Sequence, residues 1–167
     1  MISRRLLRIK ILQSIYAYRK SGSSDFVNQY KEFEFSIKKS YSLYLHIIQL
    51  LLEVKHYTNI RIDQIQNRVI KDEKEWQKLV KLANNKIFLQ LENNQKFQSL
   101  VRNEKVSWGN QKHLIKEIYT IIIESDLYKE YCESEDTYDS DKKFIKKILL
   151  LVIAESEKLY SFLEETS

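Results

Sequence analysis

Three arginines near the start of the chain have the side-chain type and spacing needed to bind phosphate. Arg8 lies four residues after Arg4 and three after Arg5, so on a helix all three share one side. The planar guanidinium group pairs bidentately with phosphate and stacks on nucleic-acid bases. The chain has 21 Lys but only 7 Arg, and three of the seven fall within residues 4–8. This clustering predicts an RNA-binding face on residues 1–22.

The charge of the chain is concentrated in the same segment. The first twenty residues contain six basic side chains and no acidic one, whereas the whole chain has a net charge of +5. The residues after Lys20 therefore sum to −1, and a field made by one short element attracts a polyanion locally. We expect a helix that Ser3 caps, that begins at Arg4 and that Gly22 ends. The alternative interpretation is a solvated, frayed N-terminus without a ligand.

Two further residues of this segment suit RNA. On a helix, Tyr16 lies about 20° from Arg5 and continues that edge of the basic face, where its ring can stack an unpaired base. Gln13 lies on the other flank, and its amide can bind a base edge. Tyr16 also fits a second interpretation, as a core residue that packs on the segment 41–48.

A second basic cluster lies near the C-terminus, at Lys142, Lys143, Lys146 and Lys147, and is the other candidate for phosphate contacts. Asp139 and Asp141 precede it directly and cancel its distant field, so an ordinary solvated face is the alternative. The segment 124–141 has eight acidic residues, whose spacing matches no calcium loop and is typical of a solvated surface.

The sequence favours no enzymatic chemistry, cofactor or metal. His46, His56 and His113 are far apart, and we expect His46 to be a hydrogen-bonded packing residue. Cys132 stands among glutamates, which raise a thiol pKa and make a poor nucleophile. With one cysteine, two glycines and no run of 18 apolar residues, we expect a cytoplasmic protein without a disulfide, a phosphate-cradling loop, a signal peptide or a membrane-spanning helix.

The expected architecture is all-α, a helical bundle of about six to eight helices with a basic N-terminal helix and one long helix. Two glycines and no proline leave few places for β-turns. Apolar residues at spacings of three and four predict a long helix from Ile37 to Val69, weakened at residues 55–59, and a shorter one before it over 26–35 that Asp25 caps. Asp72 begins another helix, and a final helix covers 142–164. We expect 84–141 to be an irregular, partly acidic, insertion-like segment, with short helices over 84–110 and a clear helix from Leu114 to Ile122.

The segment Arg4–Ala17 (RRLLRIKILQSIYA) resembles the first helix of the NusB family, which has approximately the pattern R-R-x-x-R-x-x-A-[LV]-Q-x-[LI]-Y. Arg4, Arg5, Arg8, Gln13 and Tyr16 match the arginines, the glutamine and the tyrosine of this pattern, while Ile11 replaces its small residue. Residues 1–167 resemble the N-terminal half of a longer variety of NusB-like protein, and the motifs of the family's second half do not occur.

The resemblance implies a helical transcription antitermination factor. Such a protein binds the boxA element of ribosomal RNA leader transcripts together with NusE, a ribosomal protein, and joins the RNA polymerase antitermination complex. It implies that the five matching residues contact single-stranded RNA. The competing hypothesis is a helical protein–protein interaction module that does not bind RNA.

Overall fold

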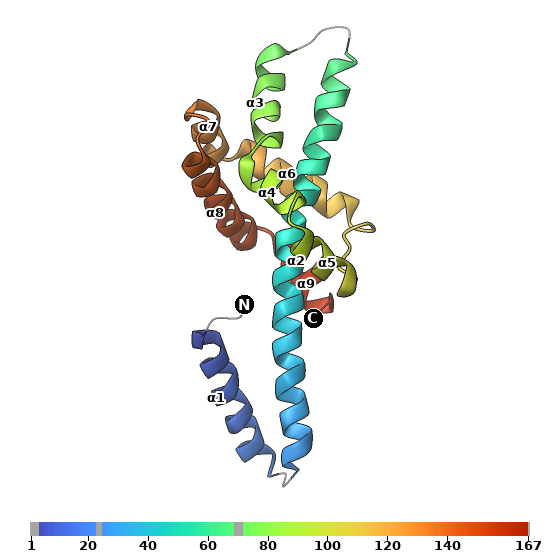
Figure 1. The fold of residues 1–167 in the computed structure, drawn as a ribbon, viewed down its shortest axis with the longest axis vertical. Helices are drawn as coiled ribbons and strands as arrows, with labels where there is room; N and C mark the ends of the chain where they lie inside the picture. Colours follow the sequence, from blue (N-terminus) through green and yellow to red (C-terminus); the bar gives the residue numbers. More distant parts are fainter. Residues whose placement is uncertain (1–3, 23–24, 69–71, 167) are drawn as a thin grey trace.

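The computed structural model describes residues 4–22, 25–68 and 72–166, and all its regular elements are helices (Figure 1). The predicted all-α class and the long helix are therefore confirmed. The described residues form nine helices, one more than the upper limit we expected. In chain order they are α1 (Arg4–Ser21), α2 (Phe26–Gln66), α3 (Glu73–Ala83), α4 (Lys86–Glu92), α5 (Gln95–Asn103), α6 (Lys112–Glu124), α7 (Asp126–Glu133), α8 (Tyr138–Glu155) and α9 (Glu157–Thr166).

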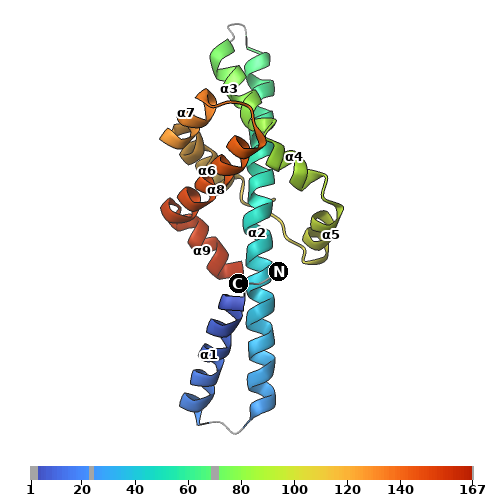
Figure 2. The same ribbon diagram turned by 60° about the vertical axis from the view of Figure 1, so that its left-hand side comes forward.

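Helix α2 is the axis of an elongated molecule (Figures 1 and 2). Its first half carries only α1, which folds back antiparallel along it, and its second half is surrounded by the other helices. We call α1 with residues 25–44 the arm, and residues 45–166 the body. The arm projects away from the body at one end of the molecule.

Burial along α2 changes sharply where the arm meets the body. No residue between Phe26 and Tyr44 is buried, whereas the buried positions of α2 begin at Leu45 and end at Ile65. In the body, Leu50, Leu51 and Val54 join one large core that also draws side chains from α3, α4, α6, α7, α8 and α9. The body therefore holds the hydrophobic core of the described residues.

Helix α2 is one continuous helix, although the sequence predicted two over this range. Asp25 caps it as expected, because its side chain accepts a hydrogen bond of 3.0 Å from the backbone N–H of Asn28. The helix runs through the predicted joint, where the Ser36 and Ser40 hydroxyls donate back to the Phe33 and Ser36 carbonyls, at 3.0 and 2.9 Å, and are satisfied within the helix. Two positions used in the prediction, Ser3 and Val69, lie outside the described residues.

The polar stretch at 55–59 does not weaken α2. Lys55 is buried and forms an ion pair with Glu92 at the end of α4. Thr58 is fully buried, and its hydroxyl donates to the Val54 carbonyl at 2.8 Å. Both polar groups are satisfied inside the body, so the helix continues without interruption.

The segment 84–141 is more regular than we expected. Its asparagines act as caps: Asn85 accepts from the Ile87 N–H at 2.9 Å and Asn94 from the Phe97 N–H at 3.0 Å, which begins α4 and α5. Between α5 and α6, Trp108 is only 1% exposed and donates its indole N–H to the His46 carbonyl at 3.1 Å. This segment therefore builds the core instead of being inserted beside it.

The predicted final helix is divided at Ser156. This buried serine has an extended backbone, and its hydroxyl accepts a hydrogen bond of 3.2 Å from the Leu159 N–H. Ser156 therefore acts as the N-cap of α9. The break turns α9 so that Leu159 enters the large core.

Candidate nucleic-acid interface

The candidate interface is α1, the outer helix of the arm. It ends at Ser21, and Gly22 follows with φ = 62°, a left-handed conformation that glycine adopts without strain. At the same end, the Tyr18 ring contacts the Phe26 ring edge to face, with centroids 6.3 Å apart. These features return the chain toward the body, so that α1 runs antiparallel along the first half of α2 (Figures 1 and 2) and Arg4 is at the end of α1 farther from the turn.

Arg4, Arg5 and Arg8 are all exposed on α1. Among the described residues, none of the three forms an ion pair. They also occupy the first two turns of α1, where the helix dipole disfavours cations and attracts anions. The structure thus places three exposed guanidinium groups at one helix end, where the sequence predicted them.

The arm carries the positive charge of the whole chain. Residues 4–44 include nine basic and three acidic side chains, a net charge of +6, while the total is +5. The three acids, Asp25, Glu32 and Glu34, all belong to the α2 side, and α1 contains none. A polyanion approaching the molecule would therefore meet its positive field on α1.

Gln13 and Tyr16 are exposed as well. Tyr16 is 64% exposed, and the Lys20 ammonium lies 5.8 Å from its ring centroid. The interpretation of Tyr16 as a core residue on the segment 41–48 is therefore wrong. Its ring is available at the surface, beside a cation.

Only a narrow face of α1 packs against α2. Its half-buried residues follow spacings of three and four, and no residue of α1 is buried. Large apolar side chains remain outside this contact; Leu12, for example, is 69% exposed. The contact face consists of Leu7, Lys10, Ser14 and Tyr18.

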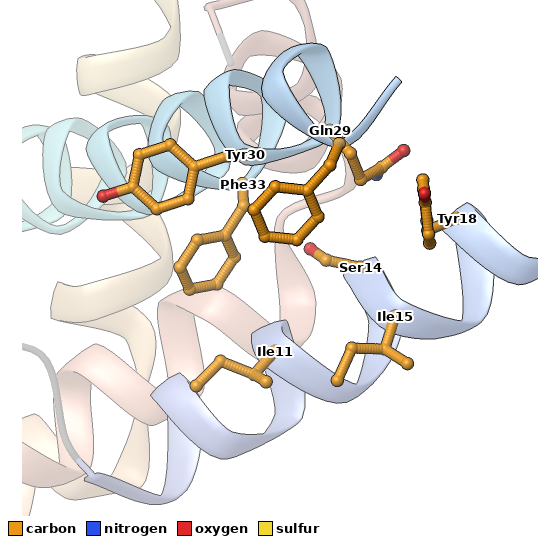
Figure 3. Close-up of a pocket in the computed structure, with 8 residues that line it drawn as sticks. Ile11, Ser14, Ile15, Tyr18, Gln29, Tyr30 and Phe33 are labelled. Carbon is orange, nitrogen blue, oxygen red and sulfur yellow. The ribbon is translucent and has the colours of Figure 1, made fainter. Parts of the chain in front are cut away.

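An apolar groove runs between the two helices of the arm (Figure 3). Its volume is about 260 Å³, it is open to solvent, and the polar groups of its lining are the side chains of Ser14 and Gln29 and the hydroxyls of Tyr18 and Tyr30. Side chains from both helices project into it (Figure 3). The sequence pattern did not reveal this groove, because periodicity does not determine which helices lie beside α1. The lining residues are Ile11, Ser14, Ile15, Tyr18, Phe26, Gln29, Tyr30 and Phe33.

The second basic cluster is separate from the arm. Lys142, Lys143, Lys146 and Lys147 are exposed on α8, which lies on the body, and the Lys147 ammonium is 3.8 Å from a Glu130 carboxylate oxygen. The structure does not bring this cluster together with the arginines of α1.

Asp141 is not an exposed acid that neutralises the charge of these lysines from the surface. It is 5% exposed; its Oδ1 accepts a hydrogen bond of 2.6 Å from the Tyr131 hydroxyl, and its Oδ2 accepts one of 2.9 Å from the Lys86 N–H. The Asn85 side chain donates to the Tyr131 hydroxyl at 3.1 Å. Sequence reasoning missed this network because its members are up to 56 residues apart. The other seven acids of 124–141 are exposed, as expected.

His46 and Cys132 have structural surroundings. His46 is buried, with Nδ1 2.9 Å from the Ser42 carbonyl oxygen and its ring against Trp108 and Phe162, which confirms the predicted packing role. Burial raises the pKa of the Cys132 thiol. The expected direction is thus correct, but the main cause is burial and the neighbouring acid Glu133 is a minor one.

Within the described residues, no group of three histidine, cysteine or acidic side chains is arranged to hold a metal ion. No helix of that part of the chain is both long and apolar enough to cross a membrane. Comparisons with protein-family models, with curated proteins and with solved structures find no match for this chain.

Proposed function

We propose that this protein is an RNA-binding transcription antitermination factor of the NusB type, which binds boxA-like single-stranded RNA through α1. The observation that carries RNA binding is the exposed set of Arg4, Arg5 and Arg8, which has no ion-pair partner among the described residues, on an arm of net charge +6. Phosphate contacts by such groups dominate nucleic-acid affinity. Tyr16 supports a single-stranded ligand, because only unpaired bases can stack on an exposed ring.

The transcription role rests on the resemblance of Arg4–Ala17 to the first helix of the NusB family. In this proposal the protein acts with NusE and within the RNA polymerase antitermination complex, in the cytoplasm. The exposed lysines of α8 are secondary candidates for RNA contacts, on a different part of the surface. The proposal assigns no catalytic residue.

The decisive experiment is a titration of labelled boxA-like RNA at several salt concentrations. Log K should fall linearly with log salt, with a slope of about −0.7 per phosphate neutralised on a single strand. In the triple variant Arg4→Ala, Arg5→Ala and Arg8→Ala, affinity should fall and the slope should flatten by about 2. A shuffled RNA of equal length tests sequence preference, and added NusE tests joint binding.

A matched variant removes the same charge from the body. Lys74, Lys96 and Lys112 are exposed, and none has an ion-pair partner among the described residues, so their triple alanine variant should retain nearly all RNA affinity. If the two triple variants lowered RNA affinity equally, the effect would come from the net charge of the protein, and α1 would not be the RNA-binding site. If the protein binds boxA-like and shuffled RNA equally well, the proposal of RNA binding stands and the assignment to the NusB type is rejected.

A second function, a helical protein–protein interaction module, is favoured by a different observation. The arm exposes large apolar side chains on both of its helices, including Leu12, Ile15 and Phe26. Contiguous exposed apolar surface commonly marks a protein-binding site. Unchanged RNA affinity in the arginine variant would support this function over the first.

A further inference from the structure

The groove of the arm lies between two helical stripes of apolar residues. Ile11 and Ile15 form its α1 wall, and Phe26, Tyr30 and Phe33 follow spacings of four and three along its α2 wall. Such spacing on two antiparallel helices is the packing surface that a third helix uses in a bundle. The arm therefore has the form of a three-helix bundle that lacks one helix.

The α1 wall continues directly into the arginines. Arg4, Arg8, Ile11 and Ile15 are separated by four, three and four residues and share one face of α1. A helix lying along the groove would thus contact apolar side chains near the turn of the arm and two guanidinium groups at the other end. Charge complementarity requires acidic residues at that end of the partner.

Two other occupants fit this surface less well. A second copy would bring two arms of net charge +6 together, and like charges across an interface are unfavourable. RNA bases have polar edges that need hydrogen-bond partners, and besides the hydroxyls of Tyr18 and Tyr30 the groove offers only Ser14 and Gln29. An apolar helix face has no such requirement.

We propose that the groove between α1 and the first half of α2 binds one amphipathic helix of a protein partner, with acidic residues over Arg4 and Arg8 and apolar residues between Ile15 and Phe33. This site goes beyond the proposed RNA binding and overlaps it only at the two arginines. Partner and RNA would therefore compete for Arg4 and Arg8, while Arg5, about 60° around the helix from Arg8, and Tyr16 lie on the edge of the arginine face that is farther from the groove.

The test uses a labelled amphipathic helical peptide of about 18 residues, which spans ~27 Å, with leucines at spacings of three and four and glutamates at one end. It should bind the intact chain, and a version with lysines in place of the glutamates should bind at least about tenfold more weakly. The double variant Ile11→Ser and Ile15→Ser should lose at least about tenfold in affinity, and Tyr30→Ser on the opposite wall should also weaken binding.

Leu150→Ser is the matched control, because Leu150 is exposed on α8 and should not affect the peptide. The inference is overturned if the peptide does not bind, if acidic and basic peptides bind alike, or if Leu150→Ser has the same effect as the groove variants. A concentration-dependent dimer in sedimentation that the groove variants abolish would assign the groove to a second copy instead. RNA affinity is measured in every variant. If the groove variants lost as much RNA affinity as the arginine variant, the groove would be part of the RNA-binding site and not a site for a partner helix.

Discussion

The hydroxyl of Tyr131 donates a hydrogen bond of 2.6 Å to the buried carboxylate of Asp141, ten residues further along the chain. Asp141 also accepts from the backbone N–H of Lys86, so it joins α7, α8 and the first turn of α4. The Tyr131 ring stacks on Phe144 with centroids 4.0 Å apart. Tyr131 therefore belongs both to the polar network, through its hydroxyl, and to the apolar core, through its ring.

Tyr131→Phe should destabilise the protein by about 1.5–3 kcal/mol, because a buried carboxylate loses a hydrogen-bond donor. Tyr128→Phe is the matched control: the polar neighbour of the buried Tyr128 hydroxyl is the Cys132 thiol, a weak hydrogen-bonding group, so removal of the hydroxyl should cost less than about 0.5 kcal/mol or stabilise the protein slightly. Urea unfolding of both variants measures the difference. Equal destabilisation would show that the Tyr131 hydrogen bond contributes nothing specific.

Stability should fall at alkaline pH. Burial raises the pKa of Tyr119, Tyr128 and Tyr131 above the ordinary value of 10.0. Above that value the unfolded chain has released these protons while the folded protein retains them, so stability is fully present below pH ~10 and is lost as the pH rises further. Tyrosinate absorbance should rise together with the loss of helical circular dichroism. Full titration of all tyrosines with helicity retained would contradict this.

The Lys55–Glu92 pair should be asymmetric under mutation. Lys55 is buried, whereas the Glu92 side chain is 43% exposed. Glu92→Gln leaves a buried ammonium without its carboxylate and should cost about 1–2 kcal/mol, less than for a fully buried pair. Lys55→Met replaces the charge by an apolar chain of similar length and should be neutral within about 1 kcal/mol. The Lys55→Met, Glu92→Gln double variant should be as stable as Lys55→Met alone.

The arm should exchange its amide hydrogens faster than the body. No residue of α1 or of α2 before Leu45 is buried, so opening the arm exposes little apolar surface. Hydrogen exchange measured by mass spectrometry should give high protection for 45–66 and low protection for 4–21 and 26–44, although α2 is one helix. Uniform protection along α2 would mean that the arm is stabilised by something other than burial.

Tyr16→Ala should weaken RNA binding with little change in melting temperature, because the ring is exposed and a stacked base is worth about 1–3 kcal/mol. Tyr16→Phe keeps the π-face and should retain most of the affinity. The two variants are compared by thermal melting and by RNA titration. A large drop in melting temperature for Tyr16→Ala would show that the ring stabilises the fold.

Local signals in the sequence predicted the elements that depend on neighbouring residues. Asp25 and Asp72 are helix caps, α1 ends before Gly22, and the three arginines share one exposed face. Each of these features is decided within about four residues, the range over which capping and helical periodicity act.

The features that sequence reasoning missed depend on contacts between distant residues. Lys55 looked like a weak point of α2 because its partner Glu92 lies 37 residues away. Asp141 looked like one more surface acid because Tyr131 and Lys86 reach it only in the folded chain. Whether an apolar residue such as Ile15 enters the core or stays at the surface depends on which helices are nearby, and periodicity alone does not determine this.

Because α2 is continuous, a tilt of this helix at the body displaces the far end of the arm. Its 41 residues contain no glycine or proline, so the helix has no obvious hinge where arm and body meet. Phe26 lies ~29 Å from Leu45 along the axis, and a tilt of about 10° at the body would move the end of the arm by ~5 Å. A ligand held on the arm would therefore lie at a distance from the body that the length of α2 sets, and small tilts of α2 at the body would be amplified at the ligand.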